Sequence, residues 1–182
     1  MYRKTNETEV TVEIGYQTRI STGVGFYDHM LELFAFRSGL QLEVQAKGDL
    51  HIDSHHTIED VGITLGKALA EYLGDKKGIA RYGSARVPMD ESLAQVDLDI
   101  SDRPFLVFSA DIKEEMVEEF FRAFAFNAGI TLHINLLYGK NEHHKCEAIF
   151  KAVGLALCRA MKDTGGGVQS TKGGVRYDNP CD

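Results

Sequence analysis

Cysteine is scarce in this sequence and is not arranged as a disulfide framework. Only Cys146, Cys158 and Cys181 occur, and no two of them form a Cys-x-x-Cys pair. An odd number of scattered cysteines is typical of free thiols in a reducing compartment. We therefore expect a cytoplasmic protein whose cysteines are not bridged.

Long apolar runs and runs of basic residues are also absent. Charged residues interrupt the most apolar stretches, and the first seven residues lack an apolar region, so we expect neither a membrane span nor a signal peptide. The 20 basic and 27 acidic residues give a formal net charge of −7, which disfavours nucleic acid as a partner. At 182 residues with 43% hydrophobic content, the chain can form one substantial core or two small ones.

The pattern His-His-x-x-Glu occurs twice, starting at His55 and at His143, and the two copies hold four of the seven histidines. Helical residues three and four apart share a face, so each glutamate can lie beside an imidazole, as metal ligands do. Adjacent helical positions diverge by roughly 100°, so each histidine pair should serve two different metals. If the copies face each other, each metal could take one histidine from each repeat plus a carboxylate. The alternative is that the histidines merely begin a helix.

The first half of the chain reads as two strands, a helix, a strand and a second helix. Residues 7–15 alternate apolar and polar side chains, and residues 18–22 would complete a hairpin with them. A helix over 26–38 stops at Gly39, a strand covers 40–48, and a second helix starts near His55 and ends near Gly74.

The second half repeats this order, with strands at 93–100 and 105–108, a helix at 116–128, a strand at 132–136 and a helix at 143–161. Phe34-Ala35-Phe36 aligns with Phe124-Ala125-Phe126, a shift of 124 − 34 = 90, and the histidine pairs differ by 143 − 55 = 88. The sequence thus predicts an α/β (α+β) fold made of a duplicated β-β-α-β-α unit, with antiparallel or mixed sheets that carry helices on one face. The first repeat would cover 1–85, the second 86–163 and a glycine-rich tail 164–182, all in one compact chain.

The same alignment places Asp28-His29 opposite Glu118-Glu119, in the first turn of the first helix of each repeat. A lone His29 would more often be structural. Its counterpart is also able to bind a metal, so His29 and Glu119 are candidate additional ligands.

Several charged groups outside this pattern suit an anion. Arg81 and Arg103 lie on loops or strand starts, where a guanidinium can bind phosphate or simply form a surface ion pair. The tail combines glycines with Ser170, Thr171 and Lys172, which can surround an anion, although its spacing is not that of a P-loop and a floppy terminus is the alternative. Neither a Gly-x-Ser-x-Gly motif nor the context of a catalytic cysteine is present.

With these motifs in view, the chain resembles the imidazoleglycerol-phosphate dehydratase family over nearly its whole length. The motifs that carry the resemblance are Arg3-x-Thr5-x-Glu7-Thr8, Gly23 to Leu31, Asp53 to Asp60, Arg81-Tyr82-Gly83, Pro88-Met89-Asp90-Glu91, Gly129 to His133, His143 to Glu147 and Ser170 to Gly173. The resemblance implies a ribosomal S5 domain 2-like fold and a 24-mer whose active sites, each with two Mn²⁺ ions, draw groups from neighbouring subunits. We expect no fused phosphatase domain of the kind that some bacterial members of the family carry.

The resemblance also assigns roles to the candidate residues. It implies the metal ligands His29, His55, His56, Glu59, His143, His144 and Glu147. It implies the phosphate-binding residues Arg81, Arg103, Ser170, Thr171 and Lys172. Glu7 would lie near the reacting carbons and bind substrate there, and it joins Glu59 and Glu147 as a candidate catalytic carboxylate. Members of the family often have histidine where this chain has Glu119, which therefore replaces an imidazole ligand by a carboxylate.

The implied reaction is the dehydration of imidazole glycerol phosphate to imidazole-acetol phosphate in histidine biosynthesis, by a hydro-lyase. The departing hydrogen has no adjacent carbonyl to make it acidic, so a metal-bound imidazolate ring would have to supply electrons and expel the hydroxyl group. A carboxylate such as Glu7 could then take the proton. A dinuclear metal-dependent phosphate hydrolase and a metal-binding assembly protein are the alternative functions.

Overall fold

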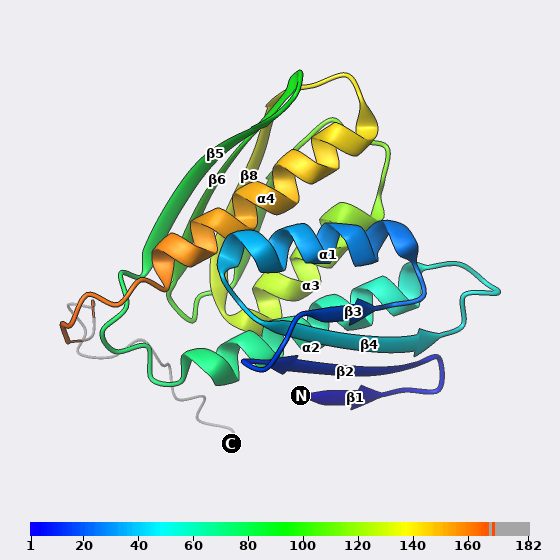
Figure 1. Cartoon of the computed structure of the whole chain (residues 1–182), viewed down its shortest axis with the longest axis horizontal. Helices are drawn as coiled ribbons and strands as arrows, with labels where there is room; N and C mark the ends of the chain where they lie inside the picture. The colour runs from blue at the N-terminus through cyan, green and yellow to red at the C-terminus, as the bar shows by residue number, and fades with distance from the viewer. Residues whose placement is uncertain (168, 170–182) are drawn as a thin grey trace.

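Two four-stranded sheets enclose four helices in the computed structural model, which describes residues 1–167 and residue 169 (Figure 1). The predicted Ser170, Thr171 and Lys172 lie outside the described residues. In chain order the elements are β1 (Tyr2–Lys4), β2 (Thr8–Ile14), β3 (Arg19–Ser21), α1 (Gly25–Ser38), β4 (Leu42–Gly48), α2 (His55–Leu73), β5 (Tyr82–Met89), β6 (Ser92–Ile100), β7 (Phe105–Ser109), α3 (Met116–Ala128), β8 (Ile130–Tyr138) and α4 (Glu142–Ala160). The predicted α/β fold is confirmed.

The first sheet has the order β1-β2-β4-β3. Alternation along β2 buries Val10 and Val12 and leaves Glu9 exposed, as the period of two predicts. The predicted hairpin of residues 7–15 and 18–22 is wrong, because β3 pairs with β4 in parallel and not with β2. A parallel pair needs a crossover, and α1 supplies it between β3 and β4.

The second sheet repeats the first, with the order β5-β6-β8-β7 and β7 parallel to β8. Each repeat therefore has one strand more than the predicted unit, namely β1 and β5. β1 has only three residues. β5 alternates buried Gly83 and Ala85 with exposed Ser84 and Arg86, but Gly83 and Pro88 are residue types that disfavour a strand interior. Since β5 begins at Tyr82 and pairs with β6, residues 82–85 belong to the second sheet.

The helices of the two repeats pack against each other between the sheets, α1 on α4 and α2 on α3 (Figure 1). Aromatic rings fill the centre, and Tyr27, Phe34, Phe120, Phe124 and Phe150 are almost fully buried. Burial of such side chains contributes about 1.5–3 kcal/mol each to the driving force for folding. Because the pairs join one helix from each repeat, side chains from distant parts of the chain meet along them. No helix in the described part of the chain has the length and apolarity needed to cross a membrane.

Two equivalent glycines set the distance between the helices of each pair. A Cβ on Gly66 would lie 2.6 Å from the Phe124 carbonyl oxygen, and one on Gly154 would lie 2.6 Å from the Phe34 carbonyl oxygen. These contacts repeat with the shifts of 88 and 90 residues that the sequence shows. The duplication thus extends to the packing of the helices.

We expect Gly66→Ala and Gly154→Ala each to lower the free energy of unfolding by about 1–3 kcal/mol, because the added methyl group would push a helix backbone away. Gly25→Ala is the control, since a Cβ there has no heavy atom within 4 Å. Urea unfolding monitored by circular dichroism measures the difference. Equal stability of all three variants would show that the close helix approach is not required.

Candidate functional site

The doubled histidine motif begins α2 and α4, and both of these helices start on the side of the molecule where α1 also starts (Figure 1). Asn141 caps α4, and its side-chain oxygen accepts hydrogen bonds from the backbone N–H groups of His143 (2.9 Å) and His144 (3.3 Å). At α2, an Asp53 carboxylate oxygen accepts one from the His55 N–H group at 2.8 Å. These bonds fix the histidine pairs at the first turn of each helix.

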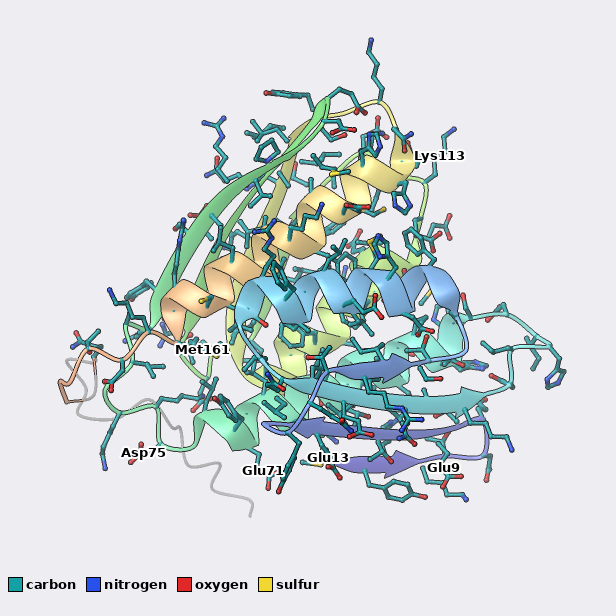
Figure 2. All side chains as sticks on the ribbon, viewed as in Figure 1. Glu9, Glu13, Glu71, Asp75, Lys113 and Met161 are labelled. Carbon is teal, nitrogen blue, oxygen red and sulfur yellow. The ribbon has the colours of Figure 1, made fainter. Side chains whose placement is uncertain are left out.

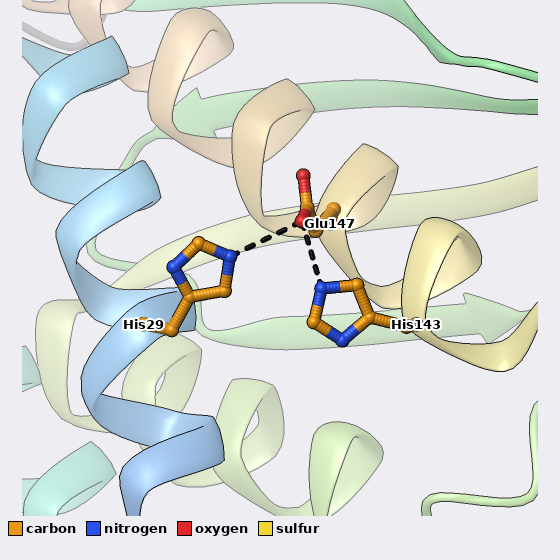
Figure 3. Close-up of side chains that lie close together, drawn as sticks. All are labelled: His29, His143 and Glu147. Carbon is orange, nitrogen blue, oxygen red and sulfur yellow. Dashed lines mark hydrogen bonds and ion pairs between the residues drawn. The ribbon is translucent and has the colours of Figure 1, made fainter.

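His29, His143 and Glu147 form a cluster between α1 and α4 (Figure 3). One oxygen of Glu147 lies 3.1 Å from His29 Nε2 and 2.8 Å from His143 Nε2. The two imidazole rings stack at 5.6 Å with an interplanar angle of 12°. The cluster thus has one histidine from each repeat plus a carboxylate, although the histidine from the first repeat is His29 and not a member of the His55-His56 pair.

Lys151 also binds Glu147, one helical turn further along α4. Its Nζ lies 2.5 Å from the second carboxylate oxygen of Glu147. Burial alone would raise the pKa of Glu147, but hydrogen bonds from Lys151, His29 and His143 outweigh this effect and hold the pKa at about 2. Glu147 is therefore an anion with one oxygen directed at the two rings and the other at Lys151. Sequence reasoning missed Lys151, although its spacing of four residues from Glu147 was a usable signal.

The second histidine of each pair has its own acidic partners. His144 Nδ1 lies 2.8 Å from Glu91 Oε2, and His56 Nδ1 lies 2.9 Å from Asp49 Oδ2. The hydrogen bond to its carboxylate raises the pKa of each histidine. His56 Nε2 also lies 3.9 Å from Glu7 Oε1. His143 and His144 thus point to different partners, as their angular separation on a helix requires.

Such a hydrogen bond from Nδ1 orients a histidine so that Nε2 is available to a metal. Glu91 lies 53 residues from His144 in sequence, whereas Asp49 lies only 7 residues from His56, across the loop before α2. Their chain neighbours gave no signal of this role.

The repeat-related counterpart of the cluster is more open. His55 and Glu119 line one cavity of about 380 Å³ between α2 and α3, with Glu114, Glu115 and Glu118. Arg122 Nε lies 3.8 Å from a Glu119 oxygen, and Glu59 is half-buried. Within the described residues, the ligand atoms of His55, Glu59 and Glu119 do not come within 4.8 Å of one another as those of the first cluster do.

Arg81 and Arg103 meet on a shared carboxylate. Asp99 accepts hydrogen bonds from Arg81 Nε (2.7 Å) and Nη2 (3.1 Å) and from Arg103 Nη2 (3.1 Å). Arg81 Nη1 also donates to the carbonyl oxygen of Gln169 at 2.5 Å, so the tail leaves the described structure beside this group. The two guanidinium groups and one carboxylate give a local charge of +1, which suits an anion.

The arginines and the histidines lie at opposite ends of the second sheet. β5 and β6 pair from Tyr82↔Asp99, beside the arginines, to Met89↔Ser92, beside Glu91 and His144. Seven residue steps at about 3.3 Å give roughly 23 Å between these ends. Figure 2 shows the same separation along α4. Lys113 donates a hydrogen bond to Glu142 at the start of α4, and it lies far from Met161, which caps the C-terminal end of the helix.

The chain is similar to known proteins in both sequence and fold. The family model for imidazoleglycerol-phosphate dehydratase matches residues 22–157. The chain belongs to the imidazoleglycerol-phosphate dehydratase family. The enzyme of that name from Acetivibrio thermocellus is 57% identical and covers 94% of this chain and 95% of its own length. One from Clostridium botulinum is 54% identical, with 95% of each chain covered.

Solved structures of dehydratases of this family agree in fold. The structure from Pyrococcus furiosus superimposes with a TM-score of 0.87 at 42% identity and covers 95% of this chain and 99% of its own. The one from Staphylococcus aureus gives 0.80 at 45% identity, with 90% and 98% covered. The family expected from the sequence motifs is confirmed, and so are hydro-lyase activity and a place in histidine biosynthesis.

The low pKa of Glu147 predicts a pH dependence of folding for the metal-free protein. Because its pKa is near 2 when folded and about 4.5 ordinarily, Glu147 stabilises the fold above pH 4.5 and loses this contribution as the pH falls towards 2. Glu147→Gln should thus cost on the order of 2 to 3 kcal/mol at pH 6 and progressively less below pH 4.5. Urea unfolding at several pH values measures it, with the exposed α1 residue Glu32, as Glu32→Gln, for the control. If Glu147→Gln lowered the free energy of unfolding by the same amount at every pH, the low pKa of Glu147 would be contradicted.

Proposed function

We propose that the chain dehydrates imidazole glycerol phosphate to imidazole-acetol phosphate and that it does so with divalent manganese. The observation that supports this most strongly is the His29, His143 and Glu147 cluster within the fold of a dehydratase family. Removal of one hydroxyl group and one hydrogen releases water and leaves an enol, which becomes the ketone. The thiols of Cys146 and Cys158 are free, in keeping with the cytoplasm as its compartment.

The residues of the cluster fit a divalent metal. Two imidazole nitrogens and a carboxylate oxygen lie within 4.8 Å of one another, and imidazole with carboxylate suits Mn²⁺ among other first-row metals. Three groups converge here, and Glu147 is already ionised, as a ligand must be. A metal on a ring nitrogen of the substrate would lower the pKa of that ring and stabilise negative charge on it.

We infer a second metal position on the opposite helix pair, where repeat symmetry relates His55, Glu59 and Glu119 to the first cluster. His56 and His144 have oriented rings and would complete the two ligand sets from other directions. Glu119 then stands where the repeat has His29, as a carboxylate in place of an imidazole. The cavity beside Glu119 and His55 gives room for this position.

The protein's own residues account for the other parts of the reaction. Lys151 holds Glu147 as an anion, and Asp49 and Glu91 hold the rings of His56 and His144 in one orientation. Glu7 has a side chain that is 54% exposed and lies 3.9 Å from His56, so it can reach a substrate ring beside that histidine. We assign it the proton transfer at the carbon chain.

Arg81 and Arg103 would bind the substrate phosphate. Their guanidinium groups lie together on Asp99, beside the point where the tail begins. Ser170, Thr171 and Lys172 follow directly in sequence and would add two hydroxyl groups and an ammonium group.

One molecule of substrate cannot bridge these groups within a single chain. An imidazole with a three-carbon phosphorylated chain is on the order of 10 Å long, whereas the two ends of β5 and β6 are separated by roughly 23 Å. We therefore infer that the arginines of one subunit complete the histidine site of another. This requirement supports an oligomer, and we propose the 24-mer that the sequence resemblance implies.

Turnover tests the proposed function. We expect the manganese-loaded chain to convert imidazole glycerol phosphate into an enolisable ketone, and the metal-free chain to be inactive. His143→Ala should lower the metal content and reduce kcat at least 100-fold, because it removes a ligand. The exposed His51, as His51→Ala, serves as the control histidine outside the motif.

The products decide between the alternatives. Ketone without inorganic phosphate establishes the lyase, and no turnover by the loaded protein would refute it. Release of inorganic phosphate would indicate the hydrolase instead, a reading that the comparisons do not support. If the chain retains metal and stays assembled, but Glu7→Gln has no effect on any reaction, the protein is a binding protein.

Subunit sharing has a separate test. We expect His143→Ala and Arg103→Gln to be almost inactive at low substrate concentration when each is assembled alone. When the two variants are dissociated, mixed and reassembled, some sites should pair an intact histidine cluster with an intact arginine pair and regain activity. No recovery in mixed assemblies would place the whole site within one chain.

A further inference from the structure

Three of the four non-glycine residues with positive φ in the described part of the chain surround the arginine end of the second sheet. They are Lys76 (60°), Arg81 (73°) and Asp102 (54°). Such conformations cost free energy for residues with a side chain and persist only where surrounding contacts enforce them. The contacts that enforce these three therefore need an explanation.

Lys76 and Asp102 form an ion pair that joins two loops. Lys76 lies on the connection from α2 to β5, which ends at Arg81, and Asp102 lies between β6 and β7, directly before Arg103. The Lys76 side chain is only 3% exposed and the Asp102 side chain 23%. A buried lysine cannot bind substrate itself, so its contribution acts through the loops that it holds.

Gly129, which ends α3, provides the space for this pair. A Cβ on Gly129 would lie 2.7 Å from an Asp102 carboxylate oxygen, so a larger residue would displace the aspartate. The C-terminus of a helix carries partial negative charge, which disfavours a carboxylate beside it. Lys76 offsets this repulsion, because its ammonium group is the cation that bonds to Asp102.

The two loops also determine how the arginines meet. The Arg81 N–H group donates to the Ala160 carbonyl (2.9 Å), and the Arg81 carbonyl accepts from the Ile100 N–H group (3.0 Å). Both guanidinium groups then converge on Asp99. A shift of either loop would change the spacing between Arg81 and Arg103.

We propose that the Lys76–Asp102 ion pair is a positioning element for phosphate binding, which fixes the separation of the Arg81 and Arg103 guanidinium groups. This inference rests on the proposed function, in which those arginines bind the substrate phosphate. Loss of the pair should weaken binding of the phosphate end and leave the histidine cluster of the same chain, at the other end of the second sheet, unaffected.

The test compares the manganese-loaded assemblies of Lys76→Met and of the parent chain. We expect the variant to raise KM for imidazole glycerol phosphate about tenfold and to weaken competitive inhibition by inorganic phosphate by about the same factor, with kcat changed less than about twofold. Metal content should be unchanged. Lys77→Met is the matched control, since Lys77 is the next residue, is 66% exposed and pairs with Asp75.

Two further variants guard against a loss of folding. Lys76→Met/Asp102→Gly removes both charges and places glycine, which adopts positive φ freely, at position 102, so it should fold and still raise KM. Lys76→Arg keeps the positive charge, so its KM should stay within about threefold of the parent value. Folded variants with unchanged KM and unchanged phosphate inhibition would overturn the proposal. A fall in kcat as large as the rise in KM would also overturn it.

Arg103→Gln separates this proposal from the proposed function. If it raises KM while the Lys76 variants do not, the ion pair is only structural and the phosphate assignment stands. If Arg103→Gln leaves KM and phosphate inhibition unchanged, the phosphate assignment itself is wrong.

Discussion

The close packing of α1 against α4 is the contact on which the candidate site depends. Gly154 allows α4 to approach the α1 backbone at Phe34, and two turns earlier on α4 this approach places Glu147 beside His29. His29 and Glu147 are 118 residues apart in sequence. A change in the helix spacing by the width of a methyl group would separate the His29 imidazole from the Glu147 carboxylate, so the core and the site share one constraint.

The electrostatics of the site follow from a consistent pairing of imidazole with carboxylate. Glu147 serves two histidines, whereas Asp49 and Glu91 each hold one ring nitrogen. Glu147 would be costly to bury alone, and the two histidines and Lys151 compensate its charge. The same pairing holds the histidines in the orientation that the proposed metal binding would require, so the same hydrogen bonds would stabilise the fold and prepare the site.

The opposite end of the second sheet is held by arginine–carboxylate contacts instead of imidazole–carboxylate contacts. There, two arginines share Asp99, and residues with unfavourable backbone conformations are held by buried contacts. The long separation between this end and the histidines is the reason why we propose a functional unit larger than the chain. Duplication suits the proposed assembly, because two equivalent helix pairs would offer two metal positions to a neighbouring subunit.

The sequence by itself determined the duplication, the order of most elements and the identity of the histidine motif, because helix and strand periodicity and a repeated His-His-x-x-Glu are local signals. It also identified His29 through the alignment of the repeats. It did not reveal β1 and β5, since one is very short and the other contains Gly83 and Pro88. It also predicted the wrong partner for β3, because the crossover through α1 places β3 beside β4 and not beside β2.

Only the tertiary structure decided which residues meet. It brought His29 to His143 and Glu147 and joined Arg81 to Arg103 through Asp99. It also placed Asp49 beside His56 and Glu91 beside His144. These contacts depend on the packing of one repeat against the other and on loop geometry, for which neighbours in sequence carry no signal. The separation of the arginines from the histidines likewise follows from the length of β5 and β6, and it makes a second subunit part of the proposed site.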